Sequence, residues 1–219
     1  MTRHSPIVHT DHLTNIIASR CDDFGITVEY CPYAKTASTN GKKIKLPVIK
    51  NPITIEALDK LYGYVIHECG HHVRSEAFDI LMAAKPPEHL CAIYNVVEDD
   101  GMERERALEW RGDAKALSRM NELLMGEAAD LISSPDTNID EVEPTVALLL
   151  NQYSRIPWDS DAEHQVARIL RALPDEATRL LAELVDEGWV DRFQSTETPL
   201  DTWNVAVDLA KRLYPDNDQ

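Results

Sequence analysis

Two histidines and a glutamate at a fixed spacing are the residues of this chain best suited to chemistry. The stretch "HECGHH" places His67 and His71 four positions apart, with Glu68 directly after the first histidine. On a helix, residues four apart project from one face, so both imidazoles can bind the same metal ion. Glu68 lies about 100° round such a helix from His67 and can act as general base on a metal-activated water. The spacing therefore predicts a zinc (Zn2+) hydrolase site.

A catalytic zinc site usually takes three protein ligands and leaves one position for water. The residues after the motif, "HHVRSEAF", lack the Gly and His of a metzincin, which excludes that subtype. His72 projects about 100° away from His71 on a regular helix and is not expected to bind the same ion. The third ligand must therefore come from elsewhere in the chain.

The stretch "YNVVEDDGMERE" offers that ligand. It follows a Pro-Pro break, and a helix that begins there could pack against the first one and bring Glu98 over the two histidines. Val96 and Val97 indicate that this part of the helix faces the core, where an acidic residue needs a partner. We predict Glu98 as the third ligand, with Asp99 as the alternative.

Further polar residues are expected to support the site. Asn95, Asp99 and Glu103 are candidates to accept a hydrogen bond from a ligating histidine, and the sequence does not choose among them. Peptide hydrolysis also needs a donor for the oxyanion beyond the metal. The candidates for that role are Tyr94, Tyr153, His89, His164 and Arg106.

The elements that must position these residues follow from periodicity. Apolar residues at helical spacing run from about Ile53 into His67 and predict one helix up to the break at "AAKPPEHL", followed by a helix from about His89 to Met125. Upstream, "ITVEYCPY" and the run containing Ile44 and Leu46 alternate and predict neighbouring strands of a small sheet, with an Asn-Gly turn before Ile44. An earlier helix is expected at "HTDHLTNIIASRCDDFG".

The chain as a whole is predicted to be α+β and predominantly helical. "SSPDTNIDEVEPT" is a polar, proline-containing linker, and the amphipathic helices after it predict a C-terminal helical region. We therefore expect a site-bearing domain at 1–131 and a helical region at 145–219, packed on the first or appended to it.

Three stretches together resemble a metallopeptidase family of phages and bacteria. They are "ASTNGKKIKLP", "HECGHHVRSE" and "NVVEDDGMERE", and the family is related to the N-terminal region of cobaltochelatase T-type, von Willebrand-associated proteins. The resemblance implies a zincin-like fold with a small sheet beside the active-site helix. It also implies that His67, His71 and Glu98 are ligands and that Glu68 is the base. Gly101 stands where the family pattern has an arginine.

Composition limits the partners and the compartment. The chain has 219 residues and a formal net charge of −16, which argues against a nucleic-acid partner and an anionic membrane surface. The first residues lack the apolar core of a signal peptide, so a cytoplasmic location with reduced cysteines is expected.

The combined prediction is a zinc-dependent metallopeptidase that acts on a protein or peptide. An outer strand around Ile44 to Leu46 is expected to hold an extended substrate by β-addition. The alternative is a non-catalytic adaptor on a zincin scaffold, for example the partner of an ATPase. A weaker alternative is a hydrolase of non-peptide amides or esters.

Overall fold

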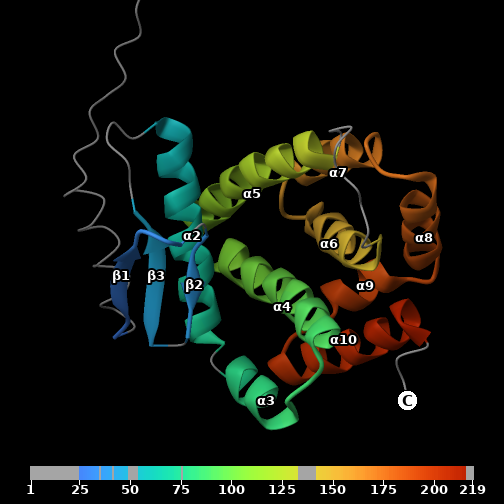
Figure 1. Ribbon diagram of the computed structural model, residues 1–219, viewed down its shortest axis with the longest axis horizontal. Helices are drawn as coiled ribbons and strands as arrows, with labels where there is room; N and C mark the ends of the chain where they lie inside the picture. The colour runs from blue at the N-terminus through green and yellow to red at the C-terminus, as the bar shows by residue number, and fades with distance from the viewer. Residues whose placement is uncertain are drawn as a thin grey trace, which may run out of the picture.

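The computed structural model describes residues 25–34, 36–40, 42–48, 54–74, 76–132 and 142–215. A small sheet is followed by helices, which confirms the α+β, predominantly helical prediction (Figure 1). The helix predicted before Gly25 lies outside the described residues. In chain order the elements are β1 Thr27–Cys31, β2 Ser38–Thr39, β3 Lys43–Pro47, α2 Ile55–Val73, α3 Glu76–Ala84, α4 Glu88–Glu109, α5 Arg111–Ile132, α6 Val142–Arg155, α7 Ala162–Leu170, α8 Asp175–Asp186, α9 Trp189–Gln194 and α10 Pro199–Leu213.

The sheet has the strand order β1-β3-β2 and lies beside α2 (Figure 1). Ile44 of β3 pairs with Val28 in the parallel strand β1 and with Thr39 in the antiparallel strand β2. The side-chain oxygen of Asn40 accepts hydrogen bonds from the two backbone N–H groups of Lys42 and Lys43, at 3.1 and 2.9 Å, and so holds the turn from β2 into β3. β3 is the middle strand, and the prediction that it is an outer strand is wrong.

Helix α2 connects the sheet to the helices. It begins at Thr54, whose hydroxyl accepts a hydrogen bond from the Ala57 N–H at 3.1 Å and so satisfies one free donor of the first turn. On another face, Ile66 packs on Leu117 and Met120 of α5. The core between α2 and the sheet consists of Ile26, Ile44, Leu46, Leu61, Val65 and Cys69. The helix that carries the two histidines is thus packed on both sides.

Each of the two long helices predicted from the sequence is divided into two helices in the structure. α2 ends at Val73, because the chain turns at Arg74 (φ −97°, ψ 40°) and its buried guanidinium pairs with a carboxylate of α4. α4 ends at Glu109, because Trp110 adopts an extended conformation (φ −132°, ψ 110°), and α5 then runs back along α2. The predictions of continuous helices across these positions are wrong.

Three of the helices described after residue 142 pack directly on α4. α6, α9 and α10 all contact it, and Tyr94 and Val97 of α4 share one apolar core with Leu149 of α6 and Ala206 of α10. The boundary predicted between residues 131 and 145 falls mostly outside the described residues. Among those that are described, no helix has both the length and the apolar character required to cross a membrane.

Candidate metal centre

Helix α2 presents two imidazoles to one point. The Nε2 atoms of His67 and His71 lie 3.2 Å apart, and the two rings are nearly perpendicular, at 88°. Both side chains are half-buried where α2 faces α4. The predicted convergence of the two histidines on one face of a helix is therefore present in the structure.

Gly70 lets α4 approach α2 closely between these histidines. A Cβ atom on Gly70 would overlap the side chain of Met102 on α4. Met102 is fully buried, so the space that the missing side chain leaves is filled. This close approach brings the carboxylates of α4 within reach of both imidazoles.

Asp99 of α4 supplies the carboxylate at this point. Its Oδ1 atom lies 3.1 Å from Nε2 of His71 and 3.6 Å from Nε2 of His67. The three ligand atoms all lie within 4.8 Å of one another. Two helices thus bring two imidazole nitrogens and one carboxylate oxygen together.

The spacing of these three atoms fits a tetrahedral metal ion. Zinc bound at about 2.0–2.1 Å separates any two of its ligand atoms by about 3.3–3.4 Å. The separations in the structure, 3.1, 3.2 and 3.6 Å, scatter around that value. Histidine and carboxylate ligands belong to the set that zinc accepts. The residues present therefore fit a zinc ion with a fourth position left over.

The predicted third ligand, Glu98, faces elsewhere. Its Oε1 atom lies 3.1 Å from Nε of Arg74, and its carboxylate is almost completely buried. Burial raises the pKa of Glu98 to about 7, although Arg74 lowers it. Asp99, the alternative ligand, lies with the histidines instead, because consecutive helical residues project about 100° apart.

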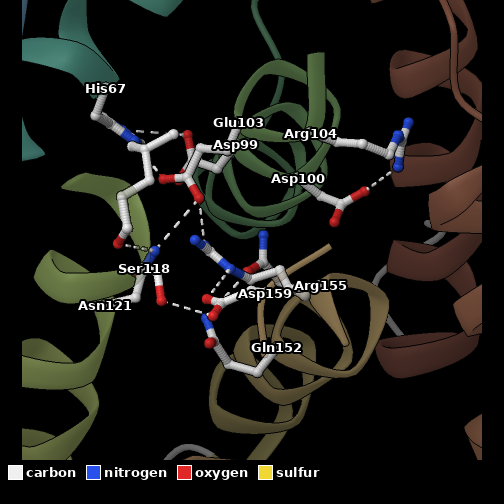
Figure 2. Close-up of polar contacts among 12 residues, drawn as sticks. His67, Asp99, Asp100, Glu103, Arg104, Ser118, Asn121, Gln152, Arg155 and Asp159 are labelled. Atoms are coloured by element: carbon white, nitrogen blue, oxygen red, sulfur yellow. Dashed lines mark hydrogen bonds and ion pairs between the residues drawn. The ribbon is translucent and has the colours of Figure 1, made fainter. Parts of the chain in front are cut away.

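Each acidic residue of "EDD" has a different partner. After Glu98 and Asp99, the carboxylate of Asp100 pairs with Arg104 at 2.6 Å and accepts a hydrogen bond from Ser154 of α6. Figure 2 shows this pair on the side of α4 away from His67. The three residues therefore do not form a solvated acidic face. They fix α4 against α2 with its C-terminal cap and against α6.

Glu103 contacts Nδ1 of His67, the ring nitrogen that does not face His71 and Asp99. Its Oε1 atom lies 2.8 Å from Nδ1 of His67, and its Oε2 atom pairs with Nη1 of Arg155 and lies 3.5 Å from the amide nitrogen of Asn121 (Figure 2). A carboxylate on Nδ1 fixes the tautomer and leaves Nε2 free for a metal. Of the three candidates for this role, Glu103 is the one that contacts Nδ1 of a ligating histidine, whereas Asp99 lies at the Nε2 atoms as a ligand candidate.

The negatively charged groups around His67 favour the binding of a cation. Burial opposes the imidazolium, but the carboxylates of Asp99, Glu103 and Glu68 outweigh it and raise the pKa of His67 to about 9. Burial also opposes the ionised carboxylates, yet His67 and His71 hold the pKa of Asp99 below its usual range. The cations Arg155 and His67 do the same for the pKa of Glu103. Three carboxylates thus surround the imidazoles, which attracts a metal ion.

Glu68 lies in the cavity that the site opens into. The cavity has a volume of about 240 Å³, and His67, Glu68, Asp99 and Glu103 are among the residues that line it. Only 6% of Glu68 is exposed, and burial raises the pKa of its carboxyl group above its ordinary value. The lining also contains Leu124, Met125, Leu148, Asn151, Gln152 and Arg155. The predicted base therefore shares this cavity with two of the three ligands, His67 and Asp99.

The predicted oxyanion donors lie outside this cavity. None of the five is among the described residues that line it. The ring of Tyr94 packs on Trp203, and Arg106 pairs with Asp113. Tyr64 of α2 does line the cavity, although no motif in the sequence singles it out.

Sequence reasoning also missed Arg155 and Asn121, both of which contact Glu103. Their positions bear no fixed spacing to the histidines. One signal was available: "TVALLLNQYSR" continues an apolar run into polar residues, and this helix is buried to its end at Arg155. Polar residues that continue a buried helix indicate an internal polar cluster.

Comparison of the chain with protein-family models, with curated proteins and with solved structures found no match in any of the three.

Proposed function

We propose that this protein is a zinc-dependent metallopeptidase of zincin-like fold, in which His67, His71 and Asp99 hold the metal and Glu68 is the general base. The observation that carries the proposal is the convergence of the three ligand atoms, two of which belong to residues that line the same cavity as Glu68. The order of His67, Glu68 and His71 on one helix supports the same roles. The resemblance of three sequence stretches to a metallopeptidase family agrees with the proposed activity and with the roles of His67, His71 and Glu68, but it implies Glu98 in place of Asp99 as the third ligand.

The chain's own residues have distinct tasks in this proposal. Zinc, when bound, polarises a carbonyl oxygen and lowers the pKa of a coordinated water toward about 7. Glu68 accepts a proton and returns it to the leaving amine, and the raised pKa of its buried carboxyl group suits that exchange. Glu103 keeps the Nε2 atom of His67 directed at the other ligands.

Strand β2 is suited to hold an extended peptide. Thr36 and Ala37, just before β2, line the cavity together with the site residues. β2 pairs with β3 on one side, and no other strand of the described residues pairs with it. A peptide can add to such an edge through backbone hydrogen bonds. β2 thus takes the role that the sequence analysis gave to Ile44 to Leu46.

The test combines metal analysis with cleavage of a proteome-derived peptide mixture. The wild-type chain is expected to hold about one zinc per molecule and to create new peptide ends. Glu68→Gln should keep the zinc and lose cleavage, because the ligands remain and the base is gone. Glu76→Gln, which changes an exposed glutamate of α3, is the matched control and should cleave like the wild type.

Two results would contradict the proposal. A wild-type chain that holds no zinc after dialysis against a zinc-containing buffer would show that the site does not bind the metal. Equal cleavage by wild type and Glu68→Gln would show that Glu68 is not the base. Zinc binding without any cleavage, in a protein whose cellular role survives Glu68→Gln, would favour the adaptor alternative.

A further inference from the structure

We propose that Arg155 of α6 is a positioning residue of the metal centre, which acts on His67 through Glu103. This inference rests on the proposed function, since it assumes that His67 binds the metal. It makes Arg155, which lies 84 residues beyond His71 in the sequence, part of the metal centre. Its basis is a continuous series of contacts from α6 to α2.

Glu103 is held at both carboxylate oxygens. Oε1 accepts from Nδ1 of His67 at 2.8 Å, and Oε2 pairs with Nη1 of Arg155 (Figure 2). Glu103 and Arg155 are 2% and 1% exposed, so water does not replace either contact. The carboxylate is therefore clamped between the metal ligand and the guanidinium.

Arg155 has two further contacts besides Glu103. Its Nε atom lies 3.9 Å from Oδ2 of Asp159, and its guanidinium stacks over the Trp158 ring at 4.7 Å. Asp159 in turn accepts a hydrogen bond from the Ser118 hydroxyl of α5 at 2.7 Å. The position of Arg155 is thus set by α5 and by the turn after α6, and does not depend on Glu103 alone.

These contacts have a consequence for His67. A buried carboxylate without a cation tends to gain a proton or to move. If Arg155 were absent, Glu103 would hold Nδ1 of His67 less firmly, and Nε2 would no longer be fixed toward His71 and Asp99. Outer partners of metal ligands typically contribute about 10- to 100-fold to metal affinity.

A buried ion pair without a link to the metal centre would behave differently, and Arg106 of α4 with Asp113 of α5 provides one for comparison. Arg106 and its partner Asp113 are 5% and 0% exposed, which matches the burial of Arg155 and Glu103. The contacts of Arg106 run to Asp113 and Glu109, away from the metal centre. Arg106→Met is therefore a matched control for the loss of a buried guanidinium.

The experiment measures the zinc dissociation constant of the full chain by competition with a chelator. Arg155→Met is expected to weaken binding by about 10- to 100-fold, and Arg106→Met to leave it within about threefold. In a Glu103→Gln background, Arg155→Met should add less than about threefold, because its effect passes through Glu103. The visible spectrum of the Co²⁺-loaded chain should change with Arg155→Met and not with Arg106→Met.

Unchanged affinity and spectrum in Arg155→Met would overturn the inference. So would a loss that adds fully to that of Glu103→Gln, or one that Arg106→Met reproduces. Should Arg155→Met fail to fold, Arg155→Lys carries the test. Its single ammonium lacks the fork that engages Glu103 and Asp159 together, so zinc binding should still weaken by at least about threefold. Wild-type binding by Arg155→Lys would contradict the inference.

A metal-free measurement separates this inference from the proposed function. In the chain labelled with ¹⁵N-histidine, Arg155→Lys should shift the ring nitrogen signals of His67, because the acceptor at Nδ1 is less firmly held. If the wild type bound no zinc, the proposed function would fail, while these signals would still decide whether Arg155 acts on His67. Unchanged His67 signals would contradict the link.

Discussion

Oδ1 of Asp99 lies 3.1 Å from Nε2 of His71, and this contact joins α4 to α2 at the candidate metal centre. The residue before it, Glu98, turns to Arg74 instead. A difference of one residue thus separates a carboxylate that can bind a metal from one that fixes the end of α2.

Asp99 and Glu98 are expected to differ in their effect on metal binding. Asp99→Asn should weaken zinc binding by more than about 100-fold, because it removes a ligand and not only an outer partner. Glu98→Gln should leave the dissociation constant within about threefold, although it lowers stability by leaving Arg74 buried without its charge partner. Chelator competition on both variants checks this, and the reverse order would assign the ligand to Glu98.

Metal binding is expected to release protons near neutral pH. The pKa of His67 in the metal-free chain is raised from 6.5 to about 9, so its imidazole is charged at pH 7.5 or so and must lose a proton to bind a metal. Titration calorimetry in buffers of different ionisation enthalpy should show about one proton released per zinc. His67→Gln should abolish the zinc heat, and a wild type that releases no proton would contradict the charged state of His67.

The same shift predicts how the stability of the metal-free chain depends on pH. A folded-state pKa above the unfolded value stabilises the fold fully below about pH 6.5, and this contribution is lost as pH rises through about 9. Urea unfolding with a chelator present should therefore show lower stability at pH 9 than at pH 7. His67→Gln should flatten that part of the profile, and an unchanged profile would argue against the ion pairs around His67.

The close approach of α4 to α2 at Gly70 predicts a clear packing effect. Gly70→Ala places a methyl group against Met102 and should lower the free energy of unfolding by about 1–3 kcal/mol. It should also weaken zinc binding, because α4 carries Asp99. Gly112→Ala, in the first turn of α5 with no atom within 4 Å of the added group, is the control and should be neutral or slightly stabilising. Equal effects of the two changes would contradict this packing.

Removal of the metal should lower stability by a predictable amount. A ligand that binds only the folded state, at about 100 times its dissociation constant, adds about 2.7 kcal/mol to the free energy of unfolding. The wild type should show this increment on addition of zinc, measured by urea unfolding. Asp99→Asn should show none at the same zinc concentration. An increment of equal size in Asp99→Asn would place the metal elsewhere.

The sequence predicts the local parts of the site well. The stripe of apolar residues that leads into His67 predicts the helix, and the helix places His67 and His71 on one face without any information from the rest of the chain. The sheet follows in the same way from alternation in its strands. The strand order does not, because the pairing of Ile44 with both Val28 and Thr39 depends on contacts that periodicity does not encode.

The choice between Glu98 and Asp99 lies beyond such patterns. Helix α4 is buried on most of its sides, and its charged residues form ion pairs in the protein interior. No polar face of the helix therefore indicates which carboxylate turns to α2. The role of Arg155 is equally hidden, because only the packing of α6 on α4 brings it to Glu103. No fixed sequence spacing identifies residues that act through tertiary contacts.

The most direct test is a crystal structure of the zinc-loaded chain with anomalous diffraction at the zinc edge. The predicted result is one zinc ion bonded to Nε2 of His67, Nε2 of His71 and a carboxylate oxygen of Asp99, at about 2.0–2.1 Å each. Glu68 should lie beside the fourth position without binding the ion. A zinc ion bound away from these three side chains, or no anomalous peak between α2 and α4, would contradict the proposed metal centre.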